Sequence, residues 1–119
     1  MTVIRAAISV EKDTQNDITK QAVKLFKEVQ KKNPNAEICA LFASQTDDLK
    51  SYNCCTAIRK AFGTDFALEC FQEVHIENQV PKIIRFSIFC SNDFKPVFVY
   101  LDKASSLRAD LLTSSETSN

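Results

Sequence analysis

The residues best suited to chemistry in this sequence are arginines that lie within apolar segments. Arg85 interrupts the apolar run from Lys82 to Cys90, and Arg5 interrupts another near the start of the chain. An arginine in so apolar a strand needs a partner, because burying an unpaired charge is costly. A guanidinium group forms charge-assisted hydrogen bonds with carboxylates. The pattern therefore favours a site for anionic groups, or an ion pair between Arg85 and an acid such as Glu73.

Motifs for other common chemistries are absent. The sequence has no glycine loop that could cradle phosphate, no nucleophile elbow, and no histidine beside a candidate serine or cysteine. Its cysteines are odd in number and lack paired C-x-x-C spacing, and only His75 could add a nitrogen ligand. We expect no metal site and no disulfide framework. Most of the cysteines should be reduced, buried apolar residues: Cys39, Cys54, Cys55, Cys70 and Cys90.

The bulk properties indicate one soluble domain. The chain has 119 residues, of which 45% are hydrophobic and 25% charged, so a disordered or fibrous protein is excluded. Fifteen basic residues balance fifteen acidic ones, which argues against binding to nucleic acid or anionic lipid. Charges at Arg5, Glu11 and Lys12 interrupt any signal-peptide core, and no apolar run is long enough to span a membrane. A cytoplasmic location is expected.

The elements that must position the arginines follow from hydrophobic periodicity. Their order predicts a single α+β domain, in which a mixed sheet has helices packed on one face. We expect strands at Val3–Val10, Glu37–Ala43, Phe66–Cys70, Lys82–Cys90 and Pro96–Leu101, helices at Thr14–Lys32 and Cys54–Phe62, and a helical turn at Lys103–Leu107.

Side-chain alternation indicates which way these strands face. Arg5 should project opposite the row of Ile4, Ala6 and Ile8, and Arg85 should share its face with Ser87 and Phe89. The strand at 37–43 is apolar on both faces, so it should be central in the sheet. Thr14 and Asp17 resemble a capping box, and Gly63 should end the second helix.

Six stretches together carry a resemblance to a known family. IRAAISVEKDT, SQTDDL, AIRKAFG, ECFQEV, VPKIIRFSIF and VYLDKASSLRADL occur in this order from Val3 to Leu112. In this order and spacing the chain resembles the AroH-type chorismate mutases. The resemblance implies a chorismate mutase-like domain over residues 1–113. Residues 114–119 are polar and lack apolar anchors, so we expect them to form a flexible tail. The resemblance also implies a homotrimer of pseudo-barrel subunits, with active sites between neighbours and no cofactor.

The resemblance further implies which residues line the active site. Arg5, Arg108 and Tyr100, with Arg59, would hold the two carboxylates of chorismate. Arg85 would face the ether oxygen, and Glu73 with Cys70 would contact the ring hydroxyl. Leu107 would complete the substrate-binding set. The implied reaction is the pericyclic rearrangement of chorismate to prephenate, a step in phenylalanine and tyrosine biosynthesis.

The sequence departs from the family pattern around this set. Ala6 replaces a common glycine, and Ile83 replaces a common cysteine. The loop that often reads SATPDL and FPA is SQTDDL and NCC here, with Asn53 in place of an aromatic residue and Cys54 in place of a proline. These changes lie beside the charged residues and leave them intact.

Two other functions remain alternatives. An imine deaminase of the Rid type has a similar trimeric fold and also uses an arginine at a subunit cleft, although none of that family's motifs is found here. A non-catalytic trimer that binds an aromatic metabolite would be favoured if the changes at Ala6 and Asn53 spoil the pocket. Taken singly, Arg5, Arg59 and Arg108 would be read as surface ion-pairing groups.

Overall fold

The computed structural model describes residues 1–108, except for the side chain of Arg108. The predicted domain boundary at 113 and the predicted tail at 114–119 lie outside these residues. The elements are β1 (Thr2–Ser9), α1 (Gln15–Lys32), β2 (Ile38–Gln45), α2 (Cys54–Phe62), β3 (Ala67–Gln72), β4 (Ile83–Cys90), β5 (Val99–Leu101) and a 3-10 helix, η1 (Asp102–Arg108).

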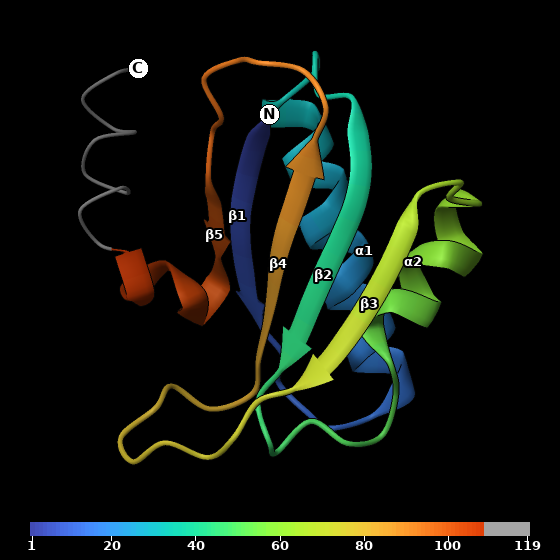
Figure 1. The fold of residues 1–119 in the computed structure, drawn as a ribbon. Coiled ribbons are helices and arrows are strands. Elements are labelled where there is room, and N and C mark those ends of the chain that lie inside the picture. The colour runs from blue at the N-terminus through green and yellow to red at the C-terminus, as the bar shows by residue number, and fades with distance from the viewer. Residues whose placement is uncertain (109–119) are drawn as a thin grey trace.

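The strands form one mixed sheet in the order β3-β2-β4-β1-β5. Strand β4 runs antiparallel to β1 and β2, whereas β5 is parallel to β1 and β3 is parallel to β2. In Figure 1, α1 lies behind the sheet and α2 lies beside β3, and both helices pack into one core on the same side of the sheet. The predicted fold class, a mixed sheet with helices on one face, is confirmed. We call the opposite side the open face.

The expectation of a central strand at 37–43 is met only in part. Strand β2 is an interior strand, flanked by β3 and β4, but β4 occupies the middle of the sheet. The apolar side of β2 that carries Phe42 is uncovered, because Phe42 is 40% exposed. Within residues 1–108, no helix packs on the open face of β2.

The main core lies between the sheet and the helices. Strand β4 contributes Ile84, Phe86 and Ile88, and α1 contributes Leu25 and Phe26, all nearly or fully buried. Burying one such side chain stabilises the fold by about 1.5 to 3 kcal/mol. The predicted alternation is confirmed, because Arg85, Ser87 and Phe89 face away from this core and are only partly buried.

Helix α1 begins as its sequence predicts. The Thr14 side chain accepts a hydrogen bond from the Asp17 backbone N–H at 3.1 Å, which is the first half of a capping box. The Asp17 carboxylate instead accepts from the Lys12 N–H at 3.2 Å and so holds the preceding loop. Helix α2 ends at Gly63, whose φ of 58° is the left-handed conformation expected of a terminating glycine.

Strand β5 is shorter than predicted, and the Asn33 side chain explains why. Its amide nitrogen donates to the Val97 carbonyl at 2.9 Å, and its oxygen accepts from the Val97 N–H at 2.8 Å. These bonds occupy the backbone groups that a strand would use, and Pro96 has no N–H to offer. The predicted strand from Pro96 is therefore confined to Val99–Leu101.

A small second core covers one end of the open face. Helix η1 places Ala104 against Ala7 and Ile83, and Tyr100 and Leu107 pack beside them. Among residues 1–108, no such cover lies over the rest of the open face, which comprises β2, β3 and most of β4. Within residues 1–108, no helix is both long and apolar enough to cross a bilayer.

Candidate active site

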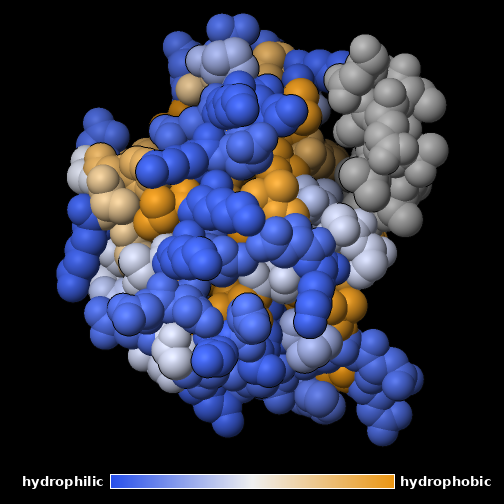
Figure 2. Space-filling view, turned by 180° about the vertical axis from the view of Figure 1, so that it is seen from behind, coloured by the Kyte–Doolittle hydropathy of each residue, from blue (hydrophilic) through white to orange (hydrophobic). Residues whose placement is uncertain are grey.

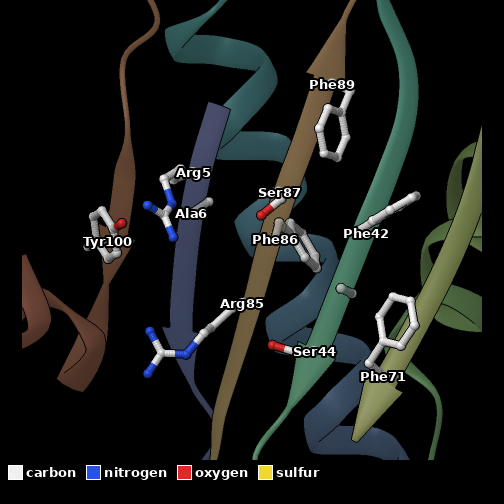
Figure 3. A pocket seen from close by; sticks show the side chains of 11 residues that line it. Arg5, Ala6, Phe42, Ser44, Phe71, Arg85, Phe86, Ser87, Phe89 and Tyr100 are labelled. Atoms are coloured by element: carbon white, nitrogen blue, oxygen red, sulfur yellow. The ribbon is translucent and has the colours of Figure 1, made fainter. Parts of the chain in front are cut away.

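A cavity of about 320 Å³ lies on the open face and extends across the sheet. Its charged and polar lining comes from β1, β2, β4 and β5, and its apolar lining is mainly aromatic (Figure 3). The residues that line it are Arg5, Ala6, Phe42, Ala43, Ser44, Phe71, Arg85, Phe86, Ser87, Phe89 and Tyr100.

Arg85 is positioned by a clamp at the start of β4. The Thr46 N–H donates to the Ile83 carbonyl at 3.0 Å, and the Ile83 N–H donates to the Thr46 hydroxyl at 2.9 Å. The Asp48 carboxylate accepts from the Lys82 N–H at 3.1 Å. Because the residues before Arg85 are fixed in this way, the pleat of β4 aims its side chain onto the open face.

Glu73 lies directly beside Arg85. Its Oε2 atom is 3.2 Å from Arg85 Nε and accepts a hydrogen bond from the Ser44 hydroxyl at 2.6 Å. The Glu73 backbone N–H donates to the Gln45 carbonyl at 2.8 Å, so the acid follows directly from the end of β3. The Arg85 side chain remains 42% exposed and the Glu73 side chain 25% exposed. The ion pair foreseen as an alternative therefore exists, but it is partly open to solvent and can still meet an anion.

Arg5 and Tyr100 form the opposite side of the cavity. The parallel pairing of β1 with β5 sets Tyr100 against Ala7, two residues along β1 from Arg5. Figure 3 shows the Arg5 guanidinium beside the Tyr100 ring, with Arg85 further along the sheet. Two guanidinium groups, one carboxylate and one phenol thus converge on one hollow. This arrangement can hold a small dianion and contact a hydroxyl at the same time.

Other predicted site residues are not brought to this cavity within one chain. Cys70 precedes Phe71 on β3 and faces the helix side, where it packs against the main core. Arg59 is exposed on α2, on the helix-covered side of the sheet. Leu107 packs in the second core. The side chain of Arg108 lies outside the described residues.

Cys70 instead opens into a second cavity of about 250 Å³ at the β3 edge. Its sulfur lies within 4.8 Å of those of Cys54 and Cys55. Hydrogen bonds from the Cys54 and Cys55 thiols hold the pKa of Cys70 well below its ordinary value, although burial opposes the shift. The expectation of reduced, mostly buried cysteines is met by Cys54, Cys55 and Cys90, while Cys39 is exposed.

Two departures from the family pattern, at Gln45 and Cys54, are linked by a hydrogen bond. Gln45 stands where the family motif has alanine, and Cys54 stands where it has proline. The buried Gln45 side chain accepts a hydrogen bond from the Cys54 N–H at 2.7 Å, a donor that proline would lack. Its amide nitrogen donates to the carbonyls of Leu49 and Tyr52. The glutamine therefore holds the loop before α2 together.

Asn53 has a structural role in place of the aromatic residue common in the family. Its side chain accepts from the backbone N–H groups of Cys55 at 2.8 Å and Thr56 at 3.3 Å, which caps α2. The changes in this loop thus build a stable start for the helix. The charged residues of the open face are unaffected by them.

Sequence reasoning missed several residues of the cavity. Ser44 binds Glu73, and the Phe42 ring lies 6.0 Å from the Phe71 ring and 5.2 Å from the Phe89 ring, centroid to centroid. Ser87 and Phe89 were placed on the correct face by alternation. Phe42, Ser44 and Phe71 could not be assigned, because their proximity depends on β2 pairing with both β3 and β4.

Comparison with known proteins identifies the class to which this fold and site belong. Residues 1–111 match the family model described as chorismate mutase type I. The chain is 28% identical to chorismate mutase AroH of Bacillus subtilis (strain 168) over 120 residues, covering 96% of this chain and 94% of the relative. A chorismate mutase structure from Clostridium thermocellum aligns with a TM-score of 0.84 at 28% identity, covering 89% of this chain and 99% of that one.

The chain therefore belongs to the type I chorismate mutase family. The resemblance read from the sequence is confirmed, and with it the expectation of an isomerase of aromatic amino-acid biosynthesis.

Proposed function

We propose that the chain rearranges chorismate to prephenate at sites shared between the subunits of a homotrimer. The observation that carries this proposal is the pairing of Arg85 with Glu73 beside a cavity that Arg5 and Tyr100 also line. Two cationic groups can hold the two carboxylates of the substrate, and the acid can accept from its hydroxyl.

Substrate positioning is the first task of this site. Chorismate rearranges in one intramolecular step, so the enzyme gains by selecting the compact conformer in which the two carbon termini meet. Arg5 and Tyr100, with Arg108, bind the carboxylates by charge-assisted hydrogen bonds. Arg59 of a neighbouring subunit adds a further contact to these carboxylates. The reaction needs no nucleophile and no proton transfer.

Stabilisation of developing charge is the second task. The carbon–oxygen bond breaks ahead of carbon–carbon bond formation, so negative charge builds on the ether oxygen and positive charge on the ring. Arg85 donates to that oxygen, and Glu73 lies near the ring with Cys70. A fixed donor aimed at such charge is worth about 2.7 to 4 kcal/mol. A millionfold acceleration requires about 8 kcal/mol, so conformer selection supplies the remainder.

The distribution of exposed residues supports a shared site. Phe42 and Phe71 are 40% and 53% exposed on the open face, and Val74 just after β3 is 76% exposed. The outer side of the helices is mainly hydrophilic (Figure 2). A second copy of this chain that covers the open face would bury the aromatic residues. Its Cys70 and Arg59 edge would then complete the cavity.

The product of the reaction tests the function. Purified protein mixed with chorismate should form prephenate, and proton NMR can follow its appearance. Unchanged chorismate, with binding of a prephenate-like inhibitor, would select a non-catalytic trimer instead. Hydrolysis of an amino-acid-derived imine without prephenate formation would select the Rid-type reaction.

The solution mass tests the assembly. Light scattering should give about 40 kDa, which corresponds to three chains of 13.4 kDa. A mass of one chain in an active sample would refute the shared site. A cytoplasmic location is part of the same proposal, and the five free thiols fit a reducing compartment.

A further inference from the structure

Three cysteines that are separate in the sequence converge at the second cavity. Cys54 and Cys55 open helix α2, and Cys70 comes from β3. Their three sulfur atoms all lie within 4.8 Å of one another. Cys54 is fully buried, Cys55 is 6% exposed and Cys70 is partly exposed. Two cysteines of the cluster are therefore shielded from solvent, and the third, Cys70, is accessible.

The spacing of the sulfurs is close to that of a metal–thiolate site. Zinc–sulfur bonds of about 2.3 Å at tetrahedral angles place two thiolate sulfurs about 3.8 Å apart. A separation of at most 4.8 Å thus requires a movement of about 1 Å or less, within reach of side-chain rotation. All three ligands are soft thiolates, which select ions such as Zn(II) and Cu(I) over Mg(II) or Ca(II).

The surroundings provide an entry path and partial compensation of charge. Cys70 lines the cavity of about 250 Å³, together with Lys50, Tyr52 and Asn53. An ion could enter there, and a water molecule could fill a fourth position. Lys50 brings a positive charge to the cavity. The first turn of the nine-residue helix α2 contains no acidic residue, so its partial positive charge also favours thiolates.

We propose that Cys54, Cys55 and Cys70 form a three-thiolate binding site for a soft d10 metal ion, with the fourth position open to the cavity. The proposal depends on the positions of the sulfurs and not on the reaction proposed above. On binding, those of the three cysteines that still carry a proton release it to solvent, and the metal keeps its oxidation state.

The test is a titration of the full chain with Cd(II), a spectroscopic probe for thiolate ligands. The protein is kept reduced with a phosphine, and a thiol assay on the denatured chain should find all five cysteines free. The wild type should bind one Cd(II) per chain and develop a sulfur-to-cadmium charge-transfer band in the ultraviolet. Mg(II) should produce no change, and Zn(II) should compete for the site.

Single cysteine variants assign the ligands. Cys55→Ser and Cys54→Ala should each weaken Cd(II) binding by more than about tenfold, since even outer partners of metal ligands are worth that much. Cys39→Ser removes an exposed thiol outside the cluster and should bind as the wild type does. Thermal melts of the metal-free proteins confirm that each variant is folded.

Two results would overturn the proposal. One is a wild type with all five thiols reduced that shows no charge-transfer band at micromolar Cd(II). The other is an equal loss of binding in Cys39→Ser and Cys55→Ser, which would place the metal at scattered surface thiols. Neither result bears on whether the chain converts chorismate.

Discussion

Replacing Arg85 with alanine separates catalysis from stability. The Arg85–Glu73 pair is 3.2 Å long and its arginine side chain is 42% exposed, so solvent screens much of the attraction. Pairs this exposed contribute roughly 0 to 1 kcal/mol to the free energy of unfolding. We therefore expect the melting temperature of Arg85→Ala to fall only slightly, because the clamp on Ile83 is untouched.

The effect on turnover should be far larger. Loss of one donor aimed at the breaking ether bond corresponds to roughly a hundredfold to thousandfold lower kcat. Arg85→Lys keeps the charge but lacks the planar fork of donors, so it should recover only part of the loss. The assay is the initial rate of chorismate consumption at saturating substrate, with prephenate confirmed by NMR.

The matched control is Lys27→Ala, which removes an exposed positive charge from α1 on the other side of the sheet. It should leave turnover unchanged. Near-normal kcat in Arg85→Ala would remove this residue from the centre of the mechanism. A large drop in melting temperature that accounts for the lost activity would instead make Arg85 a structural residue.

Three further predictions concern pH and the loops around the site. Turnover should be nearly level around neutral pH, because no proton moves in the chemical step, and a bell-shaped profile with a solvent isotope effect would contradict this. Gln45→Ala should lower the free energy of unfolding by about 1 to 3 kcal/mol, because it leaves the buried Cys54 N–H unpaired. Adding Cys54→Pro, which removes that donor, should restore part of the loss in urea denaturation, and an additive further loss would refute the pairing. Burial raises the pKa of Asp102, but hydrogen bonds from Gln21 and Lys24 outweigh it and lower the pKa below the ordinary aspartate value of 3.8. The stability that this carboxylate contributes is therefore present above that value and lost as pH falls through the folded pKa, so wild type should lose more stability than Asp102→Asn in melts below about pH 4.

Local chemistry made the helices and the strand faces predictable. The apolar residues of α1 recur at helical spacing, and Thr14 and Gly63 mark helix ends by their capping preferences. Alternation along β4 identified Arg85 as a residue of the face opposite Ile84 and Phe86. These signals act over a few residues, so a single sequence contains them in full.

The pairing of distant strands could not be predicted from such local signals. Nothing local places β4 between β1 and β2, and this order is what brings Ser44 to Glu73 and Phe42 to Phe89. The side chain of Asn33 shortens β5 through contacts made 64 residues away. Such contacts depend on the tertiary fold and leave no periodic trace.

The cysteines show the same limit. The sequence argued against a metal site because the five cysteines are odd in number and lack paired C-x-x-C spacing. The fold nevertheless sets β3 beside α2 and brings the three sulfurs together. A rule based on spacing detects only ligands that share a local motif, and these do not.

The claim that the catalytic centre joins two subunits is tested most directly by mixing inactive variants. Arg85→Ala damages the open face, and Arg59→Ala damages the α2 edge. If each site combines one open face with a neighbour's edge, trimers reassembled from equal amounts should regain about a quarter of their sites, since half of each surface is intact. We expect mixed trimers to recover turnover toward that level. Activity no higher than the mean of the two variants would show that each site lies within one chain.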